Sequence, residues 1–363
     1  MAASDKKFTQ MKWEDFQALS YAEKSHFCNH KERPYHTLFA QQFDRNMLDR
    51  LGKLATQVRR IAKTKQGMNF LQDTLSHKRA MLYFSQPSSR TFLSFYAACQ
   101  ILGLKTAEVR DTSTSSEMKG ESPGDTVRTF SSYFDLLIMR TPQQGFAERM
   151  AWLLSTTDRP VPIINAGSGK DQHPTQALLD IYTLQRSFEK RRGIDGKKVA
   201  FVGDLARGRT VRSLAWLLTN YNDVKEYFVT DPRLQITPDV LDQLDYKGVE
   251  YEVHDDFEKI IPEVDAIYMT RIQDEWDKAP GESNSIDISK YSFRADHLDK
   301  LKINAVLMHP LPRRVEIDTA VDDDPRAIYW RQVRNGMWIR VALIASTFGI
   351  DEEIQRYAQQ HLV

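Results

Sequence analysis

Short apolar segments recur along the chain, and stretches with helical spacing lie between most of them. The apolar segments cover residues 80–84, 136–139, 161–165, 199–202, 227–229, 266–269 and 305–308. Continuous apolar strands that alternate with helices are typical of parallel sheets covered on both faces. The pattern therefore predicts an α/β protein built on doubly wound parallel sheets.

The chain has 363 residues, which is too long for one ordinary core. The alternating segments fall into two sets that separate near residues 182–193. We therefore predict two domains joined by interdomain helices, the first over 36–181 and the second over 182–336. C-terminal helices over 337–363 are expected to pack back onto the first domain, and residues 1–35 are expected to form an N-terminal extension.

The extension contains Trp13, Phe16 and Leu19, whose spacing favours a short amphipathic turn. We expect it to lie on the body of the protein, with docking of a partner as the alternative, and we expect residues 26–34 to be irregular. From Asn46 onward the spacing predicts a helix. Its apolar face carries Met47, Leu51, Leu54, Val58 and Ile61.

The charge balance argues against a nucleic acid or a membrane surface as the partner, because 50 Lys and Arg residues nearly cancel 49 Asp and Glu residues. No apolar run approaches the roughly 18 residues of a membrane span. The N-terminus lacks the apolar region of a secretory signal. The only cysteines, Cys28 and Cys99, are expected to be free thiols. These features predict a cytoplasmic protein.

Residues of unusual type, most of them polar, follow the carboxyl ends of the predicted strands. In open parallel sheets, ligands bind in the crevice beyond these ends. A purely structural protein has no need for arginine at several of them. The residues, in chain order, are Ser88, Ser89, Arg90, Thr91, Arg140, His173, Gln176, Arg209, Arg271, Gln273, Pro310, Leu311 and Pro312.

Ser88-Ser89-Arg90-Thr91 stands directly before an apolar helical run over 92–102. It would form a helix N-terminus, whose free N–H groups bind anions. The hydroxyls alone fit an ordinary helix cap equally well. Arg90 favours anion binding, because its charge opposes the helix dipole while its guanidinium suits a phosphate.

His173-Pro174-Thr175-Gln176 also begins a predicted helix, with Pro174 at the first position. His173 and Gln176 would share a face and reach one small group together. A lone histidine is more often structural. The strand end and the nearby Gly167 and Gly169 favour a functional role here.

Several other chemistries lack their motifs. The loop over 203–210 has neither a dinucleotide fingerprint nor a P-loop pattern. Metal-ligand spacings and a nucleophile elbow are also missing from the sequence. We therefore expect no metal and no cofactor. An arginine-rich site with one histidine suits substrates with several negative charges, and catalysis by positioning and electrostatics.

These motifs, in this order, resemble the transcarbamoylase family and specifically its aspartate branch. The similarity extends from about residue 40 to 350. The matching blocks are Phe84-Ser85-Gln86-Pro87-Ser88-Ser89-Arg90-Thr91, Asn165-Ala166-Gly167 with Gln172 to Asp180, Val202-Gly203-Asp204-Leu205 with Gly208-Arg209-Thr210-Val211, Tyr268 to Gln273, and His309-Pro310-Leu311-Pro312-Arg313.

The resemblance implies transfer of a carbamoyl group from carbamoyl phosphate to L-aspartate, a step of pyrimidine biosynthesis. The first domain would bind carbamoyl phosphate and the second would bind aspartate. Ser88, Ser89, Arg90, Thr91 and Arg140, joined by His173 and Gln176, would hold the phosphate and carbamoyl oxygens. Arg209, Arg271 and Gln273 would hold the two carboxylates. Pro310-Leu311-Pro312 would offer backbone groups, and a cis Leu-Pro bond is implied there.

The resemblance also implies roles for Ser115 and Lys119, which match the family's mobile loop. In the family this loop enters the active site of the neighbouring subunit. A homotrimer with shared active sites is therefore implied, and Lys119 joins Arg90, Thr91, Arg140 and His173 as catalytic. Further assembly with regulatory or pathway subunits stays open.

Some positions depart from the common pattern. Gln86 and Trp276 replace a Glu and an Arg that help close the domains in some members, Ser168 replaces an acidic residue, and Arg314 adds a basic residue after Pro312. Arg314 could alter the acceptor preference.

Two alternatives to an aspartate enzyme remain. One is a transcarbamoylase with another amine acceptor, although the chain lacks the ornithine motifs and has Pro310 where the ornithine branch has Cys. The other is a non-catalytic scaffold subunit of a pyrimidine-pathway complex.

Overall fold

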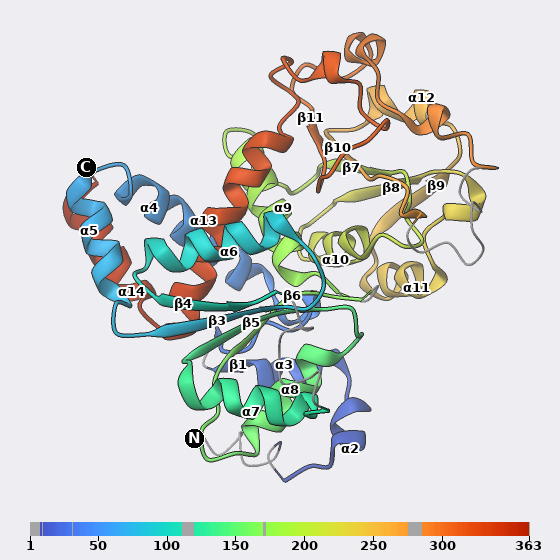
Figure 1. The fold of residues 1–363 in the computed structure, drawn as a ribbon. Coiled ribbons are helices and arrows are strands. Elements are labelled where there is room, and N and C mark those ends of the chain that lie inside the picture. Colours follow the sequence, from blue (N-terminus) through green and yellow to red (C-terminus); the bar gives the residue numbers. More distant parts are fainter. Residues whose placement is uncertain are drawn as a thin grey trace. The chain divides into compact units, whose positions relative to one another are not determined.

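The structure is a computed structural model that describes residues 8, 10–30, 32–110, 120–169, 172–274 and 285–362. It divides into two compact units (Figure 1). Unit 1 comprises residues 1–179 and 336–363, and unit 2 comprises residues 180–335. Helices α9 (Pro174–Phe188) and α13 (Tyr329–Phe348) each run across a boundary of this division. The predicted fold class, two parallel-sheet α/β domains, is confirmed.

Unit 1 is built on a four-stranded parallel sheet in the order β4-β3-β5-β6. The strands are β3 (Arg79–Phe84), β4 (Lys105–Val109), β5 (Leu136–Thr141) and β6 (Ile163–Ser168). Figure 1 shows helices on both faces of the sheet, as a doubly wound fold requires. They are α4 (Arg45–Ile61), α5 (Lys65–Thr74), α6 (Ser89–Ile101) and α14 (Asp351–His361) on one face, and α7 (Pro123–Tyr133) and α8 (Phe146–Ser155) on the other.

Helix α4 packs with the apolar face that its sequence pattern predicts. Asp44 caps its start by accepting a hydrogen bond from the backbone N of Met47 at 2.8 Å. The apolar face predicted from the spacing is buried throughout. Helix α14 packs against α4, and Phe70 of α5 stacks on Tyr357 of α14. The C-terminal helix is therefore part of unit 1.

The N-terminal extension is more regular than predicted. Residues 26–34, expected to be irregular, contain the end of helix α3 (Tyr21–Cys28) and a small antiparallel pair of strands, β1 (Asn29–His30) and β2 (Arg33–Pro34). The sequence did not indicate this helix, because α3 has no clear apolar face. A capping box between Ser20 and Glu23 stabilises its start instead.

The extension lies on the body of unit 1, as expected. Phe16 of α2 (Trp13–Gln17) is fully buried against Phe27, with ring centroids 5.0 Å apart. Lys24 pairs with Glu148 of α8 at 2.8 Å. Cys28 is one of two buried free thiols, and Cys99 is the other, which confirms the expectation of free cysteines.

Unit 2 is built on a five-stranded parallel sheet in the order β11-β10-β7-β8-β9. The strands are β7 (Lys198–Val202), β8 (Lys225–Val229), β9 (Glu250–His254), β10 (Ala266–Met269) and β11 (Val306–Met308). Helices α10 (Arg209–Leu218) and α11 (Pro238–Lys247) lie on one face, and α12 (Phe257–Ile260) lies on the other (Figure 1).

Short 3-10 turns complete the connections. They are η1 (Ala40–Gln42) in unit 1 and η4 (Pro232–Leu234), η5 (Ile261–Glu263), η8 (Ile288–Tyr291), η9 (Ala295–Asp299) and η10 (Thr319–Val321) in unit 2.

Strands β4 and β9 were not predicted, and each is an edge strand. Their sequences, KTAEV and EYEVH, contain no continuous apolar run, and each strand mixes exposed with half-buried positions and has no fully buried residue. A strand that is covered on one side only does not need two apolar faces.

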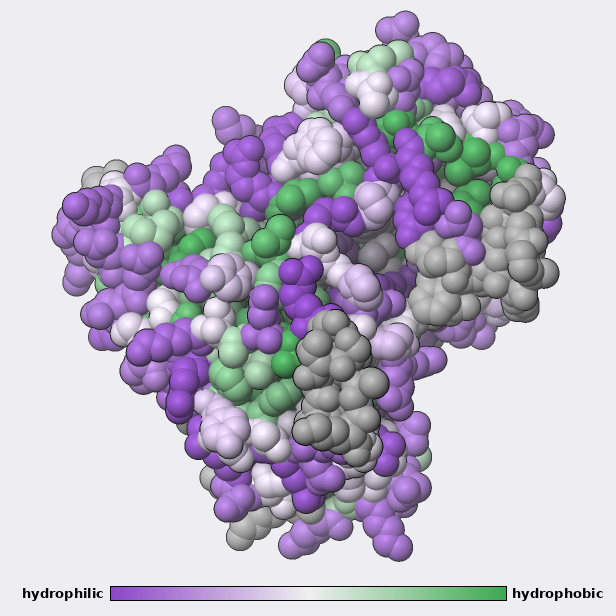
Figure 2. All heavy atoms as spheres, viewed as in Figure 1, coloured by the Kyte–Doolittle hydropathy of each residue, from purple (hydrophilic) through white to green (hydrophobic). Residues whose placement is uncertain are grey.

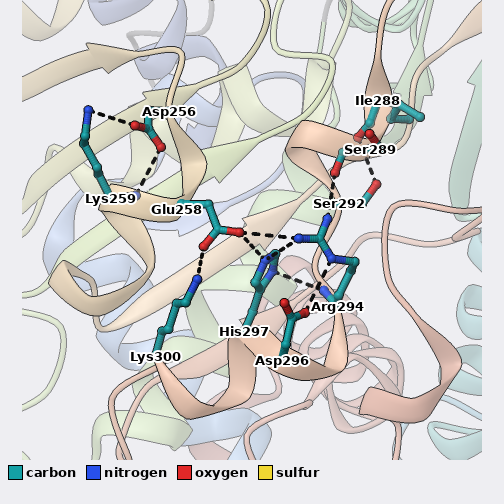
Figure 3. A network of polar contacts seen from close by, with 10 residues as sticks. All are labelled: Asp256, Glu258, Lys259, Ile288, Ser289, Ser292, Arg294, Asp296, His297 and Lys300. Carbon is teal, nitrogen blue, oxygen red and sulfur yellow. Dashed lines mark hydrogen bonds and ion pairs between the residues drawn. The ribbon is translucent and has the colours of Figure 1, made fainter.

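A polar network secures the segment before β11 (Figure 3). The buried ring of His297 accepts a hydrogen bond from the backbone N of Arg294 at 3.2 Å through Nδ1. Its Nε2 lies 2.7 Å from Glu258, which also contacts Lys300. Nδ1 accepts, so Nε2 carries the proton and donates to Glu258. These contacts join α12 to η9 and include none of the predicted site residues.

On the face drawn in Figure 2, hydrophilic residues cover most of the surface, and apolar residues form limited patches between them. None of the described helices combines the length and the apolar character that a membrane-spanning segment needs.

Glu226 of β8 is fully buried, and neither of its carboxyl oxygens has a hydrogen-bond partner among the described residues. Burial raises the pKa of this carboxyl well above its usual range. The folded protein therefore keeps a proton that the unfolded chain loses at the ordinary pKa. Stability from this group is fully present below the unfolded pKa and falls as pH rises towards the folded pKa, by about 1.4 kcal/mol for each pH unit.

We predict that Glu226→Gln stabilises the protein at pH 7, by at most about 3 kcal/mol. Its gain in thermal midpoint should be larger at pH 8 than at pH 5. Glu108→Gln, which alters an exposed carboxyl on β4, serves as the control and should change the midpoint little at either pH. An equal gain for Glu226→Gln at both pH values would contradict the assignment.

Candidate active site

The end of β5 and the end of β6 bring Arg140 and His173 together in unit 1. Both side chains are buried. Nη1 of Arg140 donates to the carbonyl of Ala166 at 3.2 Å and lies 3.4 Å from Nε2 of His173. Gly167 makes this approach possible. Its φ is +116°, and a Cβ there would lie 2.7 Å from Arg140 Nη1.

Asn165 shapes the turn that carries Gly167. Its side-chain oxygen accepts from the backbone N of Gly167 at 2.8 Å, and its amide nitrogen donates to the carbonyl of Leu38 at 2.9 Å and to the hydroxyl of Ser168 at 3.2 Å. Ser168, a departure from the family pattern, is therefore a partner of this turn.

The start of α6 lies beside Arg140 because β3 and β5 are paired, with Phe84 opposite Arg140. The backbone N of Gln86 donates to the carbonyl of Arg140 at 3.3 Å. Ser88 occupies the N-cap position of α6, yet its side chain accepts no capping hydrogen bond from the described helix. The alternative reading of the hydroxyl as a helix cap is therefore not supported.

The remaining members of the first motif differ in exposure. Ser89 and Arg90 are exposed, whereas Thr91 is buried in the first turn of α6. The free N–H groups of this turn and the nearby guanidinium groups give the half-site a positive character suited to an anion.

Helix α9 begins at Pro174, as predicted. The backbone N of Gln176 donates to the carbonyl of His173 at 3.0 Å, so His173 directly precedes the helix and Gln176 lies in its first turn. Both side chains are buried. Unit 1 therefore places the predicted residues Arg140 and His173 in contact, with Gln176 one turn along from His173.

In unit 2, Asp204 joins two of the predicted loops, although the sequence indicates no role for it beyond membership of the 202–205 motif. Its fully buried carboxylate accepts from the backbone N of Arg207 at 3.1 Å and of Gln273 at 3.0 Å. Arg207 in turn donates to the carbonyl of Gln273 at 2.9 Å. Asp204 therefore fixes the loop after β7 against the loop after β10.

The predicted acceptor residues lie on these loops. Arg209 is the first residue of α10, directly after the β7 loop. Arg271 follows β10, and its Nη1 donates to the carbonyl of Ile272 at 2.9 Å. Arg271 and Gln273 are both half-buried, so their side chains reach solvent at the carboxyl edge of the sheet.

The loop after β11 contains a cis peptide bond between Leu311 and Pro312, as the resemblance implied. Leu311 has φ +56°, a conformation that is unfavourable for a branched side chain. Its backbone N donates to Nδ1 of His309 at 2.7 Å, and Nε2 of His309 lies 2.7 Å from Glu316. His309 is therefore protonated at Nε2, and its two ring nitrogens link the backbone of Leu311 to the side chain of Glu316.

Glu316 also stabilises this loop, because its carboxylate accepts a hydrogen bond from the backbone N of Arg314 at 3.1 Å. Burial alone would raise the pKa of the Glu316 carboxyl, but the hydrogen bonds from His309 and from the backbone N of Arg314 lower it below its usual range.

A buried polar chain supports the same loop. Tyr268 donates to one oxygen of Asp180 at 2.8 Å, and Gln332 donates to the other at 2.7 Å. The side-chain oxygen of Gln332 accepts from the backbone N of His309 at 3.0 Å. The apolar pattern of the strands gave no signal for these partners, because each is a single polar residue within a buried element.

Ser115 and Lys119, together with Trp276, lie outside the residues that the structure describes. Within the described ranges, no group of three or more His, Cys, Asp or Glu side chains is placed to hold a metal ion.

Two parallel α/β units with arginines at their strand ends define the class of open α/β proteins, in which ligands bind beyond the carboxyl ends of the strands. Residues 35–186 match the family described as aspartate/ornithine carbamoyltransferase, carbamoyl-P binding domain. Residues 195–347 match the aspartate/ornithine carbamoyltransferase, Asp/Orn binding domain. The chain belongs to the aspartate/ornithine carbamoyltransferase family.

Named relatives support this membership. Aspartate carbamoyltransferase 1, chloroplastic, of Pisum sativum is 42% identical over 316 residues, which cover 84% of this chain and 76% of that protein. The aspartate carbamoyltransferase catalytic subunit of Vibrio cholerae is 43% identical over 275 residues, which cover 75% of this chain and 86% of that protein.

A solved relative shows the same fold. Aspartate transcarbamoylase from Trypanosoma cruzi, in complex with carbamoyl phosphate and aspartate, is 37% identical and superposes with a TM-score of 0.74. The match covers 86% of this chain and 94% of that chain.

We predict that Gly167→Ala weakens the binding of carbamoyl phosphate by about 10- to 100-fold, because the new methyl group displaces Arg140. Titration calorimetry measures the loss. Gly145→Ala is the control, since Gly145 also has positive φ (+69°) but no described atom lies within 4 Å of its Cβ position. Equal effects of the two variants would show that backbone strain, and not Arg140, is responsible.

Proposed function

We propose that this chain transfers the carbamoyl group of carbamoyl phosphate to L-aspartate, giving N-carbamoyl-L-aspartate and phosphate. One observation carries the proposal. A buried arginine and histidine, Arg140 and His173, meet beside Gly167 at the carboxyl ends of the strands of unit 1. The relatives named above are aspartate carbamoyltransferases, and the Trypanosoma cruzi enzyme binds both substrates.

The phosphate is assigned to the start of α6. The N–H groups of its first turn and the hydroxyls of Ser88, Ser89 and Thr91 supply donors, and Arg90 supplies charge. Arg90 is exposed in the structure, so its side chain has room to turn towards an incoming anion.

The carbamoyl oxygen is assigned to Thr91, Arg140 and His173, with Gln176 nearby. A protonated His173 would place two positive charges 3.4 Å apart in buried surroundings, which is unfavourable. His173 therefore serves as a neutral imidazole that donates a hydrogen bond. Charge-stabilising donors of this kind contribute about 3–4 kcal/mol each to the transition state.

The two carboxylates of aspartate are assigned to unit 2. Arg209 and Arg271 supply charge and Gln273 an amide, while the backbone of Pro310, Leu311 and Pro312 offers carbonyl groups to the amine. An acceptor with a cationic side chain would be repelled by these arginines, which favours aspartate over ornithine.

The reaction needs no covalent intermediate. The neutral amine of aspartate attacks the carbamoyl carbon, and negative charge develops on the carbamoyl oxygen. The new C–N bond forms, the bond from the carbamoyl carbon to the phosphate oxygen breaks, and the departing phosphate accepts the amine proton. The protein contributes by positioning the substrates and by stabilising the charge.

We further propose a homotrimer in which Ser115 and Lys119 act in the site of a neighbouring subunit, a role in pyrimidine biosynthesis and a cytoplasmic location. These proposals rest on the resemblance and on the composition. The Pisum sativum relatives are named as chloroplastic proteins.

The first test mixes the purified chain with carbamoyl phosphate and either L-aspartate or L-ornithine and measures the ureido product. Product with L-aspartate alone is expected. Product with L-ornithine would support the other acceptor class. A lack of product with both would support the scaffold alternative.

We predict that Arg90→Ala weakens phosphate binding by about 10- to 100-fold and lowers turnover at a fixed carbamoyl phosphate concentration. Arg79→Ala is the matched control, since Arg79 is a half-exposed arginine at the amino end of β3, the strand that precedes Arg90. Near-normal kinetics of Arg90→Ala would remove Arg90 from the site.

A further inference from the structure

Asp274 lies between two arginines at the carboxyl edge of the unit 2 sheet. One of its carboxylate oxygens is 2.8 Å from Nη1 of Arg314. The other is 3.8 Å from Nη1 of Arg271. Two guanidinium groups that bind the carboxylate of Asp274 could also bind the carboxylate of a ligand.

The two arginines come from neighbouring parallel strands, since β10 pairs with β11. Arg271 follows the end of β10, and Arg314 belongs to the loop that contains Leu311 and Pro312. The backbone of Arg314 is held by Glu316 at 3.1 Å. Its guanidinium therefore projects from a fixed point, beside an arginine already assigned to the acceptor.

The ion pair between Arg314 and Asp274 contributes little to the stability of the fold. The side chains of Arg314 and Asp274 are 53% and 49% exposed, and an ion pair with such exposure contributes little to stability. A functional role has more support, because Asp274 carries the same group as the side chain of the acceptor proposed above.

We propose that Arg314 is an additional acceptor-binding residue, and that Asp274 occupies the Arg271–Arg314 pair until a carboxylate of the acceptor replaces it. This inference rests on the proposed function and deepens it. Asp274 acts as a tethered competitor, and its local concentration is high because it belongs to the same loop as Arg271. The acceptor must displace it, which raises the KM for L-aspartate.

The test is steady-state kinetics with L-aspartate as the varied substrate. Asp274→Asn keeps the shape but removes the charge, and we expect it to lower the KM about 3-fold with kcat unchanged. Arg314→Gln should raise the KM about 10-fold, since a charge-assisted hydrogen bond to the acceptor is lost. The KM for carbamoyl phosphate should stay unchanged in both variants.

The double variant adds a coupling test. Asp274→Asn should lower the KM for L-aspartate by a smaller factor when Arg314 is already Gln, because the competition depends on both arginines. Asp231 and Arg233 form a control ion pair after β8 of the same sheet, 2.8 Å apart, with Arg233 54% exposed. Asp231→Asn and Arg233→Gln should leave the KM for L-aspartate unchanged.

The outcomes separate the two proposals. A wild-type chain that fails to carbamoylate L-aspartate refutes the proposed function. An active wild type whose Arg314→Gln variant keeps its KM overturns the inference alone. A higher KM for Asp274→Asn, similar to that of Arg314→Gln, would show that Asp274 orients the arginines and would also overturn it.

Discussion

The parallel direction of every strand in both sheets is the constraint on which the functional features depend. Parallel strands bring their carboxyl ends to one edge, so residues far apart in the sequence become neighbours. Arg140 and His173 meet in unit 1 for this reason, although 33 positions separate them. Arg271 and Arg314 approach one carboxylate in unit 2 for the same reason.

Buried carboxylates give these edges their rigidity. Asp204 binds two backbone N–H groups from different loops, and Asp180 binds Tyr268 and Gln332. Each is stabilised because its oxygens have hydrogen-bond partners, which offsets the cost of burial. Glu226 shows the contrast. Its oxygens have no partner among the described residues, and burial raises its pKa. Satisfied carboxylates therefore organise loops, whereas Glu226 makes stability depend on pH.

Much of the fold and of the candidate site was predictable from the sequence, and the failures have a common cause. Strands with two apolar faces, the apolar stripe of α4 and the start of α9 at Pro174 all follow from local patterns. The edge strands β4 and β9 do not, because one-sided burial leaves no continuous apolar run. Residues 26–34, which include the end of α3, were mistaken for an irregular segment, since a capping box and contacts with α8 set the structure of this helix.

The sequence by itself determined the class of fold, the loops that carry the candidate site and the types of residue in them, because hydrophobic periodicity and helix-start chemistry act over a few residues. Only the tertiary structure decided which side chains meet. The close approach of Arg140 to His173 needs the missing Cβ of Gly167, and the position of Asp274 between two arginines needs the pairing of β10 with β11. Such contacts depend on three-dimensional distances that no local pattern encodes.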